Sequence, residues 1–262
     1  MAKIIEVRDI SKCFGAAGEG SVVALDSLTL EMDEGEFLAV MGPSGCGKST
    51  LLNIIAGFEA ADSGVCKVAN RPVSAAGPDR GVVFQEYALF PWMTVERNVS
   101  FAMQAAGKWD AEAPARITKT LTDMGLVQFR QAFPKALSGG MCQRVAIARI
   151  LAIDAPVMLM DEPYGALDAL TRASLQEELV ALWQKTRKSI FFVTHSVEEA
   201  IYLADRVVIM TPRPGRIVLD LPIDLPRPRD VTQVQFNEYK RQILGVMHPS
   251  MLAGGHSVGS QS

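Results

Sequence analysis

The chain has 262 residues, 48% of them hydrophobic and 21% charged, which is typical of a globular protein with one large domain or a core plus a subdomain. Its formal net charge of -3 gives no basic surplus, so no nucleic-acid partner is expected. The four cysteines show neither zinc nor redox spacing and the N-terminal residues lack the apolar stretch of an export signal, so we expect reduced thiols.

The hydrophobic pattern predicts two kinds of strand. Residues 4–14 and 22–32 alternate between apolar and polar side chains, and we expect them to form an antiparallel β layer. Further along the chain, short apolar runs alternate with segments of helical periodicity, such as residues 48–58 and 170–186. This alternation of strand and helix predicts a doubly wound α/β core. Those runs are almost wholly apolar, as in strands of a parallel sheet that are buried on both faces: 36–42, 81–85, 157–163, 189–195 and 206–212.

The alternation of strand and helix is interrupted once. Residues 86–155 carry helical patterns and almost no strand signal, which predicts a helical subdomain inserted in the core. We expect the core and this insertion to occupy residues 1–220. Residues 221–262 are predicted to be a C-terminal extension that contains a short helix over 235–247 and ends in a disordered tail.

The strongest motif is GPSGCGKS, residues 42–49, a full match to the phosphate-binding loop pattern G-x-x-x-x-G-K-[ST]. A buried strand precedes it and a helix follows, which favours this P-loop over an ordinary glycine-rich turn. Lys48 would place a positive charge at the β- and γ-phosphates, and the Ser49 hydroxyl would ligate Mg²⁺. The residues expected to bind the nucleotide here are Gly42, Pro43, Ser44, Gly45, Cys46, Gly47, Lys48, Ser49 and Thr50.

A second glycine-rich segment, LSGG at residues 137–140, precedes a long apolar-periodic stretch. Ser138 is a suitable N-cap for a helix that starts there, and Gly139 and Gly140 leave backbone N–H groups uncovered. The sequence therefore predicts two anion-binding helix starts in one chain.

The apolar run VMLM ends in two acids, Asp161 and Glu162, at the tip of a predicted buried strand. We expect Asp161 to hold Mg²⁺, usually through water. Glu162 is expected to face the other side of the strand and to polarise the attacking water as a general base. Two solvated acids at a strand end are the alternative, which the neighbouring P-loop disfavours.

Two other apolar strands end in polar residues, Gln85 and His195. Ligands of open α/β sheets bind at the carboxyl ends of the strands, so both are candidates for the site. Gln85 would orient water or ligate Mg²⁺, with a turn-forming glutamine as the alternative. For His195, the position at a strand end favours a contact with a ligand, and a structural hydrogen bond, the commoner role of a lone histidine, is the alternative.

The order of these motifs resembles the ATP-binding subunit of an ABC transporter from about Ile4 to Met210. The matching elements are the P-loop, Gln85, LSGG, VMLMDE, ALD at residues 166–168, and His195. The resemblance implies ATP and Mg²⁺ as cofactors, and a second copy of the chain stacked head to tail. It also implies that Ser138, Gly139 and Gly140 face the γ-phosphate held by the P-loop of the other copy.

The same resemblance assigns further roles. Phe14 would stack on adenine, although packing in the β layer is the alternative. Asp168 would couple the two nucleotide sites, Gln85 would sense the membrane partner as well as Mg²⁺, and His195 would contact the γ-phosphate. Met141 and Cys142 depart from the commonest family pattern at the positions after LSGG.

The class of transporter is suggested by the segments TPRPGRI, LPRPRD and ALFPWMTV, which resemble importers of nitrate, sulfonate and taurine. This implies transmembrane permease subunits, an indirect partnership with an extracytoplasmic substrate-binding protein, and a peripheral location on the cytoplasmic face of the inner membrane. Tyr87, Phe90 and Trp92 would receive the permease, or else pack in the core. Two alternative functions are a non-transport ABC ATPase of DNA repair or translation and a P-loop kinase.

Overall fold

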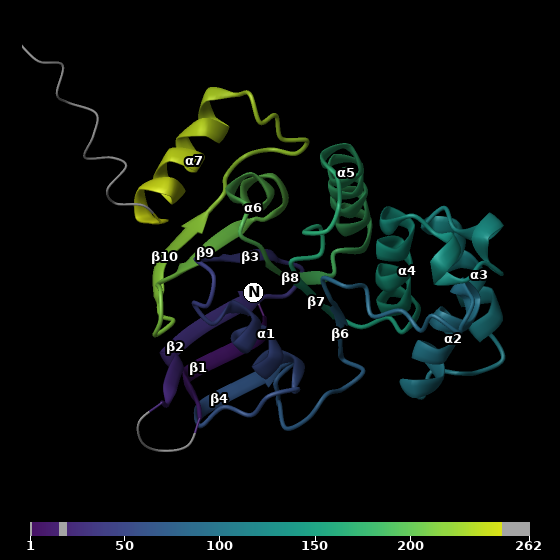
Figure 1. Cartoon of the computed structure of the whole chain (residues 1–262), viewed down its shortest axis with the longest axis horizontal. Helices are drawn as coiled ribbons and strands as arrows, with labels where there is room; N and C mark the ends of the chain where they lie inside the picture. Colours follow the sequence, from purple (N-terminus) through teal and green to yellow (C-terminus); the bar gives the residue numbers. More distant parts are fainter. Residues whose placement is uncertain (1, 16–19, 248–262) are drawn as a thin grey trace, which may run out of the picture.

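The structure is a computed structural model that describes residues 2–15 and 20–247. The predicted disordered tail lies outside the described residues. The chain folds around two β-sheets, with one helix between them and the other helices around the larger sheet (Figure 1). The α/β class predicted from the sequence is confirmed, with both the antiparallel layer and the mostly parallel core sheet.

The smaller sheet is antiparallel and has the strand order β2-β1-β4-β5. The larger sheet has the order β10-β9-β3-β8-β7-β6, and all neighbouring pairs are parallel except β9 with β10. The strands are β1 (Lys3–Phe14), β2 (Val22–Asp33), β3 (Phe37–Met41), β4 (Ser63–Val68), β5 (Arg71–Pro72), β6 (Arg80–Val83), β7 (Val157–Asp161), β8 (Ser189–Val193), β9 (Arg206–Met210) and β10 (Ile217–Pro222).

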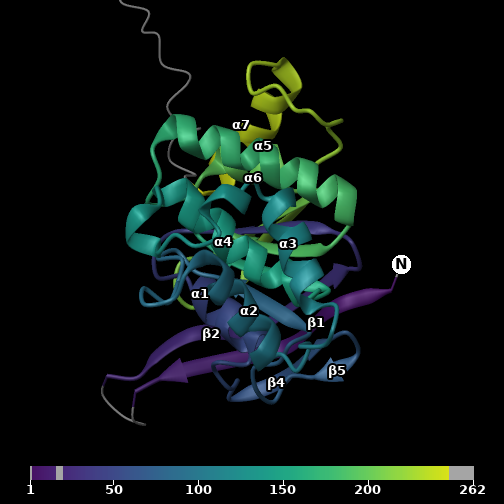
Figure 2. The same ribbon diagram turned by 90° about the vertical axis from the view of Figure 1, so that its right-hand side faces the viewer.

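The helices occupy distinct places around the larger sheet. Figures 1 and 2 show α2, α3 and α4 grouped at the end of the sheet where β6 lies, and these helices connect β6 to β7 in the chain. The helices are α1 (Lys48–Ala56), α2 (Val95–Ala105), α3 (Ala113–Asp123), α4 (Gly139–Ala152), α5 (Ala169–Thr186), α6 (Val197–Leu203) and α7 (Val234–Met247), with short 3₁₀ turns at Val127–Phe129 and Pro134–Ala136. None of the helices in the described part of the chain is long and apolar enough to cross a membrane.

The larger sheet separates two hydrophobic cores because successive strand residues point to opposite faces. Leu38 and Val40 of β3 pack with α1 and the smaller sheet. Phe37 and Ala39 of the same strand pack in the core that includes α4, α5 and α6. Every residue of β3 is buried, as expected for a central parallel strand that is covered on both faces.

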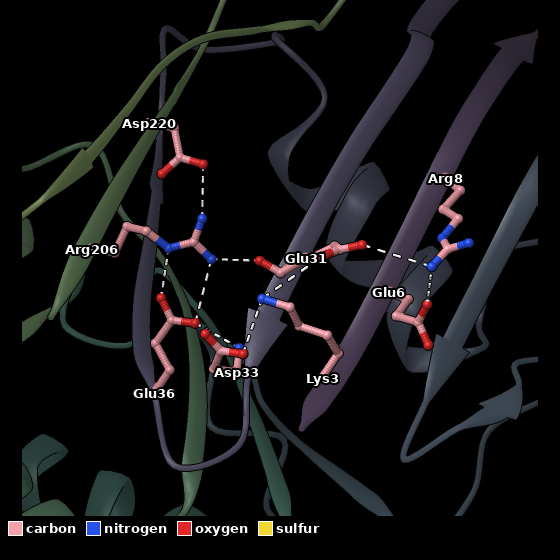
Figure 3. Close-up of polar contacts among 8 residues, drawn as sticks. All are labelled: Lys3, Glu6, Arg8, Glu31, Asp33, Glu36, Arg206 and Asp220. Atoms are coloured by element: carbon pink, nitrogen blue, oxygen red, sulfur yellow. Dashed lines mark hydrogen bonds and ion pairs between the residues drawn. The ribbon is translucent and has the colours of Figure 1, made fainter. Parts of the chain in front are cut away.

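A network of charged side chains joins the edges of the two sheets (Figure 3). Arg206 of β9 donates to Glu36 Oε1 at 2.6 Å and to Asp220 of β10 at 2.8 Å, and it also donates to the backbone carbonyl of Glu31 in β2. Lys3 of β1 pairs with Asp33 at 3.0 Å. These contacts fix the smaller sheet beside the strands that carry the phosphate-binding loop.

Candidate nucleotide site

The P-loop is a turn that only glycine can form at its two ends. At Gly42, φ is 155° and a Cβ atom would lie 2.7 Å from the Cys46 sulfur and 2.8 Å from the Met210 carbonyl oxygen. Gly47, with φ of 98°, is the N-cap of α1, and a Cβ atom there would lie 2.8 Å from the Ala24 carbonyl oxygen. No side chain of the described residues caps α1. Its first N–H groups are therefore free to bind an anion.

Lys48 is the cation of this loop. Its side chain is buried, and Nζ donates to the backbone carbonyls of Gly42 at 2.8 Å and Pro43 at 3.1 Å. These bonds hold the ammonium against the loop, where it can exchange carbonyl oxygens for phosphate oxygens. Cys46 is fully buried and its N–H donates to the Pro43 carbonyl at 3.2 Å, so its thiol does not line the pocket.

Ser49 and Asp161 bring hard oxygen atoms together. The Ser49 hydroxyl donates to Asp161 Oδ1 at 3.2 Å, from the first turn of α1 to the end of β7. Burial raises the pKa of Asp161, and the charge of Glu162 adds to that rise, while the Ser49 bond and Lys48 oppose it. No cluster of three or more metal-binding side chains exists among the described residues. This pair therefore fits Mg²⁺, which takes few protein ligands and completes its shell with phosphate and water oxygens.

Glu162 and His195 face each other at the ends of β7 and β8. His195 Nδ1 lies 3.1 Å from Glu162 Oε2, and both side chains reach solvent. The strand β7 ends at Asp161, and Glu162 has a φ of 44°. The left-handed backbone of Glu162 therefore determines where its side chain points. The prediction that the alternation of side chains along the strand determines this direction is wrong, because the strand ends at Asp161. Such backbone strain in a non-glycine residue is concentrated at functional sites.

The backbone before His195 is held by a buried hydrogen-bond network. The Thr194 hydroxyl donates to Glu199 Oε2 at 2.6 Å and accepts from the backbone N–H of Ser196 at 3.0 Å. Burial raises the pKa of Glu199, while the bond from Thr194 lowers it. This network fixes the turn between β8 and α6, so the His195 side chain projects from a rigid support.

Gln85 lies beside the segment that follows Glu162. A Cβ atom on Gly165 would lie 3.1 Å from Gln85 Nε2, and the Gly165 N–H donates to the Glu162 carbonyl at 3.1 Å. Gln85 and Glu86 are exposed, whereas Phe84 and Tyr87 on either side are half-buried. Its amide is thus near the predicted general base, at the edge of the helical group α2–α4.

An open pocket of about 340 Å³ lies beside the P-loop and reaches Glu162. Phe14 forms one wall and is 41% exposed, with the Lys12 ammonium 5.3 Å from its ring centroid. An aromatic ring open to solvent at the mouth of a pocket suits a stacked base. The residues that line the pocket are Phe14, Val22, Ala24, Ser44, Gly45, Gly47, Lys48, Ser49, Thr50, Glu162 and Arg213. A larger hollow of about 560 Å³ lies over α5 and α6 and shares none of these residues.

The LSGG segment forms the start of α4, away from this pocket. Ser138 caps the helix, and its hydroxyl accepts from the Met141 N–H at 3.3 Å. Gly139 packs against Leu167 and Tyr87, and Gly140 is buried against Thr171. Among the described residues that line the P-loop pocket, none comes from LSGG.

Asp168 is the N-cap of α5. Its carboxylate accepts from the N–H groups of Thr171 at 3.0 Å and Leu170 at 3.1 Å. The bond from the Thr171 N–H is the main cause that lowers the pKa of Asp168. A local structural role for Asp168 is therefore evident in a single chain.

The family of the chain follows from comparison with known proteins. Residues 25–165 match the family model described as ABC transporter. The chain belongs to the ABC transporter family. An uncharacterized ABC transporter ATP-binding protein of Methanocaldococcus jannaschii is 51% identical over 248 residues, which cover 95% of this chain and 92% of that protein.

Two relatives within the ABC transporter family have names that state a substrate. A nitrate import ATP-binding protein of Synechocystis is 44% identical, over 91% of this chain and 89% of its own. A taurine import ATP-binding protein of Rhizobium johnstonii is also 44% identical, over 94% of this chain and 97% of its own. A solved dimeric ATP-binding cassette with bound ADP and Pi is 31% identical, with a TM-score of 0.71 over 85% of this chain and 100% of that chain.

The predicted site residues fall into two groups in space. The P-loop, Asp161, Glu162 and His195 come together at the carboxyl ends of β3, β7 and β8, with Phe14 and Gln85 at the margins. Ser138 caps α4, Gly139 and Gly140 are the first two residues of that helix, and Asp168 caps α5. Sequence reasoning missed Val22, Ala24 and Arg213 as pocket residues. Arg213 belongs to the segment TPRPGRI, whose sequence indicates a likeness to certain importers but no contact with the P-loop.

Proposed function

We propose that the protein is the ATP-binding and ATP-hydrolysing subunit of an importer for small anions of the nitrate, sulfonate and taurine type. The observation that carries this proposal is a pocket lined by Lys48, Ser49 and Glu162 in an ABC transporter family member. Asp161 contacts Ser49, and His195 contacts Glu162. The anion class rests on the names of the nitrate and taurine relatives. Two copies of the chain would work with permease subunits at the cytoplasmic face of the membrane.

Each residue of the proposed site has its own role in ATP binding or hydrolysis. The uncapped start of α1 and Lys48 bind the phosphates, and Phe14 stacks on the base. Glu162 takes a proton from the attacking water. His195, held 3.1 Å from Glu162, orients that carboxylate and contacts the γ-phosphate. Ser49 and Asp161 would hold Mg²⁺, with Gln85 as a further candidate ligand, and the bound ion would supply positive charge to the phosphate oxygens.

The second copy supplies what the single pocket lacks. Ser138, Gly139 and Gly140 form the capped start of α4, and none of them lines the pocket of their own chain. In a head-to-tail dimer they would close over the γ-phosphate bound by the partner. ATP would then hold the dimer closed, and hydrolysis would release it, because the bridging phosphate is lost.

A cluster of aromatic side chains is the proposed docking surface for the permease. Trp92 is 68% exposed and Phe101 is 39% exposed, and both rings contact Phe90, with centroid distances of 5.6 Å and 4.8 Å. The loop between Gln85 and this cluster contains Tyr87 and Ala88, both with positive φ. Exposed apolar residues of this kind mark interaction sites. A permease bound here would therefore act on Gln85 through a short strained segment.

Co-purification with the permease tests the proposal. The wild-type chain should be retained by a tagged permease encoded beside its gene, in detergent, and should release phosphate from Mg-ATP. Trp92→Ala should weaken retention at least tenfold while the isolated chain keeps its ATPase rate, because Trp92 is exposed and absent from the pocket. Phe133→Ala, on another exposed aromatic residue of the helical group, is the control. An ATPase that binds no membrane subunit would refute the transport function.

A further inference from the structure

We propose that Arg213 binds the phosphate chain of the nucleotide and so forms part of the ATP site. Arg213 lies in the turn between β9 and β10, 168 residues after Gly45 in the chain. It lines the P-loop pocket together with Lys48 and Thr50. This inference rests on the proposed ATP-binding function and adds a residue to it.

The turn that carries Arg213 is fixed against the P-loop by its backbone. A Cβ atom on Gly215 would lie 2.2 Å from the Cys46 carbonyl oxygen, so only glycine allows this approach. The Gly215 N–H donates to the Ala24 carbonyl at 2.9 Å, and the Asp26 N–H donates to the Gly215 carbonyl at 3.3 Å. The turn is therefore locked between β2 and the phosphate-binding loop.

Side-chain hydrogen bonds also stabilise the turn between β9 and β10. The Thr211 hydroxyl donates to the Pro214 carbonyl at 2.9 Å and accepts from the Arg216 N–H at 3.0 Å. Arg216 also donates to Asp26 Oδ2, with Nε at 3.1 Å. The base from which Arg213 projects is thus held at several points, which reduces the entropy lost when its side chain binds a ligand.

Arg213 itself reaches across to the P-loop. Its Nε donates to the Gly45 carbonyl at 3.0 Å, and Nη2 lies 2.8 Å from the position that a Cβ atom on Gly45 would take. The guanidinium therefore lies directly over Gly45, where a side chain would displace it. The bond uses only Nε, so the terminal N–H groups stay available.

The charge of Arg213 is not neutralised within the described part of the chain. Arg216, three residues later, forms an ion pair with Asp26. Arg213 forms no ion pair with any carboxylate in residues 2–15 and 20–247, although it is exposed. A guanidinium fork at the edge of a pocket that already holds Lys48 matches phosphate oxygens in geometry and charge. A nucleoside di- or triphosphate is the ligand that this chemistry fits.

Calorimetric titration of the full-length chain, at a concentration where it is monomeric, tests the role of Arg213. Arg213→Ala should raise the Kd for both ATP and ADP about tenfold, because one charge-assisted contact is lost. Arg213→Gln should behave in the same manner, although it retains an N–H donor for the Gly45 carbonyl. Arg71→Ala, which removes an exposed positive charge from β5 on the other sheet, should change neither Kd.

The possible outcomes separate this inference from its alternatives. Wild-type affinity in Arg213→Gln would mean that the arginine only supports the loop, and would overturn the proposal. Unchanged monomer affinity with loss of ATP-dependent dimerisation would assign Arg213 to the partner interface instead, and would also overturn it. Lys48→Ala is measured in parallel. If it weakens ATP binding and Arg213→Ala does not, the Arg213 inference alone fails, whereas no effect of either variant would reject the pocket itself.

Discussion

Two helices of this protein begin with glycine-rich segments, and they differ in what surrounds them. The helix α1 starts after Gly47, and no side chain in the described part of the chain caps it. Its first two residues are Lys48 and Ser49, and Ser49 contacts Asp161. The helix α4 starts after Ser138, whose hydroxyl caps it. The first start presents uncovered N–H groups together with a cation and metal-binding oxygens. The second presents only the N-terminus of a helix, without a neighbouring cation or metal-binding oxygens among its contacts with the described residues.

This difference shows that a helix N-terminus does not make a phosphate site by itself. The dipole of a helix contributes about 0.3–1 kcal/mol near an exposed charge, which is too little for tight binding. The P-loop adds Lys48 and the Ser49–Asp161 pair to that field. The contacts of LSGG within residues 2–15 and 20–247 include neither a lysine nor a carboxylate, so we expect it to act only when another chain brings the phosphate to it.

Replacing Glu162 should have the largest effect and should affect turnover alone. Glu162→Gln keeps the size of the side chain but cannot accept a proton, so steady-state phosphate release should fall by about 10²–10⁴-fold. ATP affinity should stay within twofold, because the contacts of Lys48 and Ser49 are untouched. Glu198→Gln, at an exposed acid on α6 that pairs with Lys240, is the matched control. Normal phosphate release from Glu162→Gln would assign the general base to another group.

Replacing Lys48 tests the feature that most distinguishes α1 from α4. Lys48→Ala removes the buried ammonium that donates to the Gly42 and Pro43 carbonyls, and the Kd for ATP should rise by about 100-fold. Calorimetric titration measures the change, and circular dichroism checks that the loop variant folds. Lys119→Ala, on an exposed lysine of α3, serves as control. Retained affinity in Lys48→Ala would mean that the N–H cradle suffices without the cation.

The P-loop could be predicted from sequence because its parts are adjacent in the chain. An apolar strand, a glycine turn and a helix follow each other within residues 37–56, so local pattern and local structure agree. The buried parallel strands were predictable for the same reason, since burial on both faces leaves an almost wholly apolar run. The family resemblance was carried by these local motifs and is confirmed.

The contributions of distant segments could not be predicted in this way. Arg213 reaches Gly45 because the turn after β9 packs on β2 and on the P-loop, an arrangement that only the folded sheets create. The Glu162 side chain points where it does because Glu162 itself has a left-handed backbone conformation, which the alternation of strand residues does not predict. In both cases tertiary packing decides a geometry that the local sequence leaves open.

The smallest effect on a single chain is expected at LSGG, where the two helix starts can be tested against each other. Ser138→Arg should leave the Kd for ATP of the monomer within twofold, since Ser138 does not line the P-loop pocket. Loss of the cap costs about 1 kcal/mol of helix stability, and Ser138→Ala controls for that loss. In a dimer, the bulky cation should block closure over the partner's phosphate.

Mixing two inactive variants decides whether LSGG serves the other chain. A Ser138→Arg chain keeps its P-loop, and a Lys48→Ala chain keeps its LSGG, so their mixed dimer contains one intact composite pocket. With Glu162→Gln added to both, ATP should trap a dimer in the mixture and in neither variant alone, as measured by light scattering after size-exclusion chromatography. Trapping by the Ser138→Arg chain alone would show that LSGG is not needed. Failure of the mixture, with the Ser138→Ala dimer intact, would argue against a shared pocket, because one complete set of contacts then fails to bridge two chains.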